Sequence, residues 1–193
     1  YIYIGGGVLG RDIANEVTAF AEKIGGYIGS TFMGLSSLPT DCKRFLGMQG
    51  MHGHYASSMA NKEADLVIGI GVRFSDRATG NVSKYAKGSR IIQLDPDFAE
   101  INKNVTVDVG IIADVADAFR RIAEGAEARK NEAWTALVEG LVADENRFIR
   151  EAEEVEPDMT YRRTHKAEEM LDAFLSAAGH GGNQLLLFQY VGR

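Results

Sequence analysis

A glycine-rich turn near the start of the chain constrains the fold more than any other feature. The apolar run at residues 1–4 leads directly into Gly5-Gly6-Gly7-Val8-Leu9-Gly10, and an amphipathic helical pattern follows over residues 9–24. This turn has the spacing G-x-G-x-x-G, which between a strand and a helix lets the backbone approach a nucleotide phosphate. Glycine permits the approach because it has no Cβ, and a helix N-terminus favours negative charge. A glycine-rich turn without a ligand is the alternative interpretation.

Short apolar runs alternate with helical patterns along the first 125 residues. Strands are expected at residues 1–4, 27–31, 66–70, 90–94 and 106–109, and helices at 9–24, 55–62 and 116–123, the last of them exposed. Residues 32–53 are predicted to form a long loop, and such loops inside compact domains are usually functional. The alternation is typical of α/β proteins. The predicted fold class is therefore α/β, with a Rossmann-like parallel sheet and helices on both faces.

Composition changes after Gly125, and this change predicts the domain organisation. Residues 1–125 are expected to form a nucleotide-binding domain, and the charged stretch 126–162 a linker helix that Pro157 interrupts. A helix at 165–178 and a strand at 185–188 then suggest that residues 163–193 open a further domain. Because the chain begins inside a strand and without Met, we interpret it as a fragment of a longer polypeptide.

Charge and cysteine content exclude several classes of protein. The chain has 21 Lys and Arg against 27 Asp and Glu, a net charge of −6, which disfavours general nucleic-acid binding. The apolar runs are all shorter than the roughly 20 residues of a membrane span. The single cysteine, Cys42, excludes a disulfide framework and suits a reducing compartment, so a cytoplasmic location is expected. His52 and His54 are poorly spaced for a metal pair, and no metal ligands are predicted.

Polar residues follow several of the predicted strands. In an open parallel sheet, ligands bind beyond the carboxyl ends of the strands. Asp95 comes at such an end and is suited to accept hydrogen bonds from ribose hydroxyls, whereas Asp97 fits equally well as a helix N-cap. Arg73 and Arg77 flank Asp76 after another strand, which indicates either a fork for a phosphate or carboxylate or a solvated loop with a local ion pair.

The remaining motifs indicate a cofactor-holding domain. The second predicted strand ends at Ser30-Thr31, without the acid that a standard NAD site uses for the ribose. Glycines, methionines and histidines at 47–54 can adapt to a flat aromatic ligand. Because there is neither a Ser/His/Asp arrangement nor a Walker loop, we assign no catalytic residue.

Five segments, taken together, resemble the central domain of acetohydroxyacid synthase (acetolactate synthase) large, catalytic subunits. They are residues 3–8, 30–35, 46–53, 71–80 and 95–104, and the resemblance extends over about residues 1–124. Two motifs are specific to that family: Met48-Gln49-Gly50-Met51-His52-Gly53 and Arg73-Phe74-Ser75-Asp76-Arg77-Ala78-Thr79-Gly80. The sequence departs from the family pattern at Phe32, Ser75, Pro96 and Ala113 and in the tail after Gly179.

The resemblance implies a function for the longer protein. The family binds FAD in this central domain and thiamine diphosphate with Mg²⁺ in the flanking domains, the second of which residues 163–193 would begin. It condenses two 2-ketoacids with release of CO₂ in branched-chain amino acid biosynthesis, as a homo-oligomer that can carry a small regulatory subunit. The fragment alone is expected to be inactive. A pyruvate-oxidase-like central domain and a non-catalytic nucleotide-binding or oligomerisation module are the alternatives.

The resemblance also implies site residues, motif by motif. Asp76 and Arg77 are expected to face the substrate channel. FAD contacts are expected at Gly5, Gly6, Gly7, Thr31, Phe32, Met33, Met51, His52, Gly71, Arg73, Arg77, Asp95, Asp114 and Val115.

Overall fold

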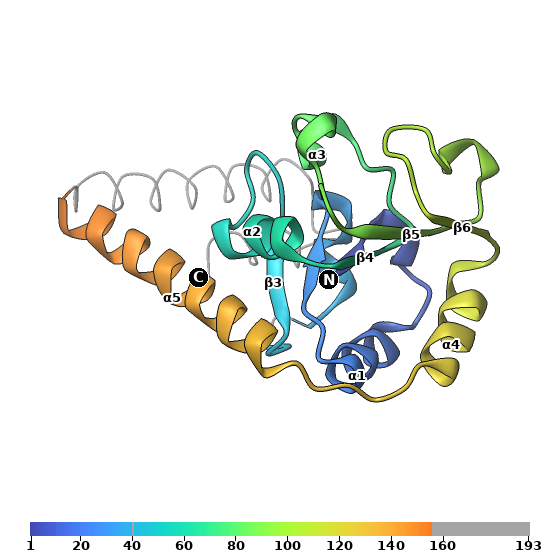
Figure 1. Ribbon diagram of the computed structural model, residues 1–193, viewed down its shortest axis with the longest axis horizontal. Helices are drawn as coiled ribbons and strands as arrows, with labels where there is room; N and C mark the ends of the chain where they lie inside the picture. Colours follow the sequence, from blue (N-terminus) through green and yellow to red (C-terminus); the bar gives the residue numbers. More distant parts are fainter. Residues whose placement is uncertain (40, 156–193) are drawn as a thin grey trace, which may run out of the picture. The chain divides into compact units, whose positions relative to one another are not determined.

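A computed structural model describes residues 1–39 and 41–155 of the chain, and Figure 1 shows the arrangement of its elements. The strands are β1 (Ile2–Ile4), β2 (Ile28–Ser30), β3 (Phe45–Met48), β4 (Leu66–Ile70), β5 (Arg90–Asp95) and β6 (Val109–Ile112). The α-helices are α1 (Ala14–Ile24), α2 (Tyr55–Glu63), α3 (Asp76–Thr79), α4 (Val115–Gly125) and α5 (Glu132–Val155). Short 3₁₀ helices are η1 (Gly6–Val8), η2 (Phe32–Ser37), η3 (Val82–Lys84) and η4 (Phe98–Glu100).

All these strands run parallel in one sheet, in the order β3-β2-β1-β4-β5-β6. The chain builds outward from β1 through β2 to β3, and then returns to place β4 on the other side of β1. The strand order reverses between β1 and β4, and ligands of open parallel sheets bind beyond the carboxyl ends of the strands at such a switch point. The predicted fold class, a Rossmann-like parallel α/β sheet, is confirmed.

Alternating side chains of the strands build a core on each face of the sheet. Ile2 and Ile4 of β1 lie in a cluster with Val17 and Phe20 of α1 and Phe119 of α4. Tyr1 and Tyr3 point to the opposite cluster, which contains Ala60 of α2 and Val138 of α5. Helices therefore cover both faces, as the fold class predicts.

The chain divides into two compact units, residues 1–142 and 143–193. The first unit holds the whole sheet and the first half of α5. Of the second unit, only the end of α5 lies among the described residues. The helix predicted at 165–178 and the strand predicted at 185–188 lie outside them, and the proposed domain organisation stays a prediction.

The prediction of a long loop over residues 32–53 was wrong, because this segment contains η2 and the edge strand β3. Phe45 and Leu46 of β3 are buried, and Gly47 has a φ of 80°. The register with β2 is irregular between Ile28 and Ser30. A strand of four residues with a left-handed glycine in it is too short to show the alternating pattern that identifies strands.

Three other elements differ from their predicted form. Helix α1 begins only at Ala14, because Gly10 and Asp12 have φ of 71° and 50° and interrupt the helical path. Strand β6 begins later than predicted, because the N–H of Val107 donates to Oδ1 of Asn102 and so belongs to the preceding loop. Helix α4 was predicted to be exposed, but Phe119 is fully buried and meets Phe20 edge to face, with ring centroids 5.3 Å apart.

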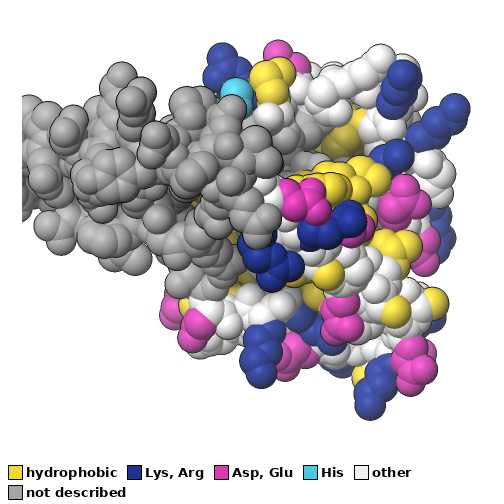
Figure 2. All heavy atoms as spheres, turned by 90° about the vertical axis from the view of Figure 1, so that its left-hand side faces the viewer, with side chains coloured by type: hydrophobic (Ala, Val, Ile, Leu, Met, Phe, Trp, Pro, Cys, Tyr) yellow, Lys and Arg dark blue, Asp and Glu magenta, His cyan; other side chains and the backbone are white. Residues whose placement is uncertain are grey.

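Acidic and basic side chains are interspersed over the part of the surface that Figure 2 shows, with small apolar patches between them. The net charge of −6 is therefore not gathered into one acidic area on this view. Within residues 1–39 and 41–155, no helix is both long enough and apolar enough to cross a membrane.

Candidate functional site

The loops after β1 and β4 touch each other through glycine backbones at the point where the strand order reverses. The N–H of Gly5 donates to the carbonyl of Ile70 at 3.0 Å, and the N–H of Gly7 donates to the carbonyl of Gly71 at 3.2 Å. A Cβ on Gly7 would lie 2.8 Å from the Cα of Gly71. The glycines are therefore required first by the contact between the two loops.

The glycine turn does not open a long helix, in contrast to its predicted form. Gly5 caps the one-turn helix η1, which Gly6 and Gly7 form with Val8, and α1 starts several residues later. Gly6 faces the loop after β2, where a Cβ would lie 3.1 Å from the Cβ of Met33. The turn thus brings the ends of β1, β2 and β4 together.

Large apolar side chains are exposed beyond β2 and β3. Thr31 caps η2, its Oγ1 accepting from the N–H of Gly34 at 3.1 Å. Phe32 and Met33 follow it and are each 60% exposed, and Met51 after β3 is 73% exposed. His52 beside Met51 is also exposed. Such a concentration of exposed apolar surface is typical of ligand or protein contact sites.

The β4 end projects Arg73 outward. Its neighbours Val72 and Phe74 are both 1% exposed, so the side chain between them must point to the opposite side, toward solvent. Phe74 has a φ of 46°, a left-handed conformation that is uncommon for a bulky residue. Helix α3 begins at Asp76, whose carboxylate accepts from the N–H of Arg77 at 2.8 Å.

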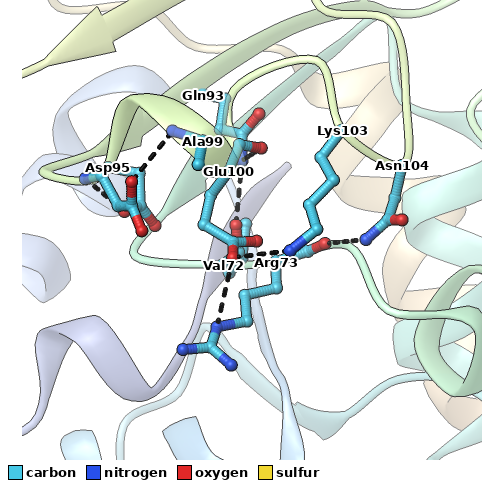
Figure 3. A network of polar contacts seen from close by, with 9 residues as sticks. Val72, Arg73, Gln93, Asp95, Ala99, Glu100, Lys103 and Asn104 are labelled. Carbon is cyan, nitrogen blue, oxygen red and sulfur yellow. Dashed lines mark hydrogen bonds and ion pairs between the residues drawn. The ribbon is translucent and has the colours of Figure 1, made fainter.

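Asp95 at the end of β5 is largely buried, and its Oδ1 accepts from the N–H of Asp97 at 2.9 Å. Burial raises the pKa of the Asp95 carboxyl above its ordinary value, with the hydrogen bond from Asp97 opposing that effect. Asp97 itself caps η4 by accepting from the N–H of Ala99 at 2.9 Å. The N-cap interpretation of Asp97 is therefore confirmed, and Figure 3 shows this end of β5.

Asp114 at the end of β6 caps α4, accepting from the N–H groups of Ala116 and Asp117 at 2.9 and 3.2 Å. Its other oxygen pairs with Arg11, a residue that the sequence did not single out. The hydrogen bond from Asp117 is the main cause that holds the pKa of Asp114 below its ordinary value. The side chain of Val115 is fully buried, so only its backbone is available to a ligand.

The candidate residues form one row along the edge of the sheet where the strands have their carboxyl ends, since each of them follows such an end. We call this the row of strand ends. Neighbouring loops are in direct contact there: the N–H of Met51 donates to the carbonyl of Arg77 at 3.0 Å. Among the residues that the structure describes, no three or more His, Cys, Asp or Glu side chains form a group that could hold a metal ion.

A cavity of about 400 Å³ lies at one end of this row, between α2 and η3. Only Met51 and Arg77 of the candidate residues line it, so this cavity and the row of strand ends overlap only in part. Within the described part of the chain, the cavity walls carry the cations Lys62, Arg77 and Lys84 and no carboxylate. This arrangement suits an anionic group.

Several buried polar residues next to the row were not predicted from the sequence. Gln93 of β5 donates to the carbonyls of Val72 and Glu100 at 3.0 and 3.1 Å, and Glu100 is paired with Lys103 (Figure 3). Two acceptors in this network, Gln93 Oε1 and Glu100 Oε2, are buried without a hydrogen-bond partner among the described residues. Glu100 stands three residues after the capping Asp97, and only this spacing on η4 marks it in the sequence.

Residues 1–122 match the family described as thiamine pyrophosphate enzyme, central domain. The acetolactate synthase large subunit of Corynebacterium glutamicum is 36% identical over 199 residues, covering 98% of this chain and 31% of that protein. The large subunit of Haemophilus influenzae is 37% identical over 118 residues, or 61% of this chain and 21% of that protein. Acetolactate synthase 2, chloroplastic, of Brassica napus is 40% identical over 131 residues, or 67% and 20%. The chain thus spans a third or less of the length of these relatives.

Proposed function

This chain belongs to the family of thiamine pyrophosphate enzyme central domains, and from that membership we propose that it is the FAD-binding central domain of an acetolactate synthase. The observation that carries the proposal is the row of strand ends. Six parallel strands present their carboxyl ends to one edge, where exposed apolar side chains follow β2 and β3 and charged side chains follow β4, β5 and β6. A dinucleotide with flat rings and a charged centre needs both kinds of surface along one crevice.

The residues present fit such a ligand in three respects. Phe32, Met33 and Met51 offer apolar surface for a ring system, and their large exposure leaves them free to contact it. Arg73 projects from the β4 end as a donor for a pyrophosphate. The buried acceptors Gln93 Oε1 and Glu100 Oε2, which lack a hydrogen-bond partner within the described residues, lie nearby, and buried groups of this kind normally have partners.

Within this proposal, the chain's own residues bind and orient the flavin nucleotide. The backbone of Gly6, Gly71 and Val115 lies at the loop ends and contributes contact without side-chain bulk. Asp95 accepts hydrogen bonds from ribose hydroxyls. Its pKa is raised because burial disfavours the charged carboxylate, and hydrogen bonds from such donors stabilise that charged form. In the longer protein, thiamine diphosphate with Mg²⁺ supplies the carbanion chemistry on the ketoacid.

The parent protein is proposed to condense two 2-ketoacids, with release of CO₂, in branched-chain amino acid biosynthesis. Arg77 is proposed to reach the ketoacid carboxylate, with Asp76 at the same turn. The cation-lined cavity supports this role, because Lys62 and Lys84 reinforce the positive potential around Arg77. The parent is further proposed to act in the cytoplasm as a homo-oligomer that can carry a small regulatory subunit.

Two measurements test the proposal. Titration of FAD into the purified chain, followed by flavin fluorescence, is expected to show saturable but weak binding, and no catalytic activity is expected from the chain alone. The full-length protein, supplied with pyruvate, thiamine diphosphate, Mg²⁺ and FAD, is expected to form acetolactate. Absence of acetolactate together with pyruvate-dependent bleaching of the flavin would instead support the oxidase-like alternative. Absence of both activities and of FAD binding would support the non-catalytic module.

A further inference from the structure

The buried carboxylate of Glu100 lies beside Arg73, the cation that the proposed function assigns to the flavin nucleotide. The Glu100 side chain is 10% exposed, whereas that of Arg73 is 79% exposed. The Nε of Arg73 lies 4.0 Å from Glu100 Oε1, and the same oxygen accepts from Lys103 Nζ at 2.9 Å. One buried carboxylate is thus shared by two cations that reach it from different loops.

The backbone on both sides of this pair is fixed by side-chain hydrogen bonds. The amide of Gln93 bridges the carbonyls of Val72 and Glu100, and so ties the residue before Arg73 to Glu100 itself. Asn104 Nδ2 donates to the carbonyl of Arg73 at 2.8 Å. Since Val72 and Phe74 are buried on either side, the starting point of the Arg73 side chain is held from three directions.

The geometry leaves one edge of the guanidinium available. Glu100 faces the Nε, and Figure 3 shows the two terminal nitrogens of Arg73 pointing away from Glu100. An arginine held at Nε keeps its terminal nitrogens as a two-pronged donor, and such a fork matches the oxygens of a phosphate. A free arginine side chain would have to lose rotamer entropy to present the same fork.

We infer that Glu100 is a positioning residue, whose charge attracts Arg73 on its Nε side so that the terminal nitrogens form a fork oriented toward the pyrophosphate of the bound nucleotide. This role rests on the proposed function, because it needs a phosphate-bearing ligand at the β4 end. Lys103 shares the carboxylate and competes with Arg73 for it. Its removal therefore leaves Glu100 more fully available to Arg73.

A double-mutant cycle on the affinity for FAD tests the role, measured by flavin fluorescence with the full chain. Glu100→Gln keeps the shape and removes the charge, and it is expected to weaken FAD binding about tenfold. Arg73→Gln is expected to weaken binding by at least as much. The double variant is expected to bind no more weakly than Arg73→Gln alone, because Glu100 then has no arginine to hold.

Lys103→Met is the control for a merely structural role. Both Glu100→Gln and Lys103→Met break the Glu100–Lys103 ion pair, so each is expected to lower the thermal midpoint slightly, but only Glu100→Gln is expected to weaken FAD binding. If Glu100→Gln does not fold, Glu100→Asp keeps the charge and withdraws it from Nε, and a loss of affinity of about threefold is expected.

The outcomes are distinguishable. A wild-type chain that fails to bind FAD contradicts the proposed function and this role with it. FAD binding by the wild type with an unchanged affinity in Glu100→Gln contradicts the role of Glu100 alone. Multiplicative effects of Glu100→Gln and Arg73→Gln in the double variant also contradict it, since independent residues would give that result.

Discussion

Individual residues decide how closely the loops at the switch point approach each other. Gly71 and Gly10 both have positive φ, 58° and 71°. A Cβ on Gly71 would lie 2.7 Å from the Cα of Gly7, whereas a Cβ on Gly10 would meet nothing within 4 Å. The two glycines therefore share a positive φ and differ in their surroundings.

This difference predicts the cost of Gly71→Ala. The substitution is expected to lower the free energy of unfolding by about 3 kcal/mol or more, because the left-handed strain adds to a backbone clash that cannot relax. Gly10→Ala, the control, is expected to cost about 1 kcal/mol, the strain of a positive φ without a clash. Urea denaturation of both variants measures the two values, and equal costs would contradict the close contact of the loops.

A second residue, Tyr85, makes the stability of the fold depend on pH. Burial raises the pKa of Tyr85 to about 12. Its hydroxyl accepts from Gln49 Nε2 at 3.2 Å and lies 3.4 Å from Asn61 Oδ1, the acceptor for its own proton. The unfolded chain loses this proton near the ordinary value of 10, so the unfolded state binds fewer protons above that pH.

The stability that the protonated Tyr85 contributes is thus complete below pH 10 and is lost as the pH rises toward 12. Tyr85→Phe is expected to be about 1 kcal/mol less stable than the wild type at pH 8. The difference is expected to change by about 2 kcal/mol between pH 10 and 12, so that it closes and then reverses in favour of the variant, because the variant lacks this ionisation. Chemical denaturation across that range measures the gap, and a constant difference would count against the buried hydroxyl.

At the scale of elements, strands and helices with long apolar runs were predictable and short or irregular ones were not. Strand β4 has the predicted bounds, because Leu66, Val67, Ile68 and Ile70 make four of its five residues large and apolar. Strand β3 was missed, since Gly47 breaks its four-residue pattern. Helix α4 shows charged residues on its outer face, and only the tertiary structure reveals that Phe119 faces the core.

The burial of α4 gives a testable difference between two phenylalanines. Phe119→Ala is expected to lower the free energy of unfolding by about 3–5 kcal/mol, since it removes a fully buried ring that packs against Phe20. Phe98→Ala is the control, because that ring is 75% exposed, and it is expected to change stability by less than about 0.5 kcal/mol. Thermal or urea denaturation distinguishes them, and similar values would mean that α4 is not part of the core.

At the scale of the whole molecule, the sequence predicts which residues lie at strand ends, and a parallel sheet then brings those ends to one edge. What it could not predict are partners contributed by distant segments. Arg11 pairs with Asp114 across more than one hundred residues of chain, and Gln93 joins Val72 to Glu100. These contacts depend on the packed arrangement of β1, β4, β5 and β6, which no local pattern encodes.

The same arrangement places Arg73 and Arg77 apart, so we expect their substitutions to affect different quantities: FAD affinity for Arg73 and KM for the ketoacid for Arg77. Arg73 projects beside Glu100 at the β5 side of the row, and Arg77 lines the cavity with Lys62 and Lys84. In the full-length protein, Arg77→Gln is expected to raise KM for the ketoacid by about 10- to 100-fold, the loss of one charge-assisted contact, with a smaller loss of FAD affinity than Arg73→Gln causes. Arg73→Gln is expected to weaken FAD binding, with little change in KM for the ketoacid at saturating FAD.

Steady-state kinetics at saturating FAD and flavin titration of the same preparations measure both quantities. Lys84→Gln provides an intermediate case, because it weakens the positive potential of the cavity without removing the proposed contact, and about a two- to threefold rise in KM is expected. If Arg73→Gln and Arg77→Gln each impaired KM and FAD affinity equally, one shared site would replace the two roles. The row would then be a single continuous binding surface, with the cavity between α2 and η3 as its end.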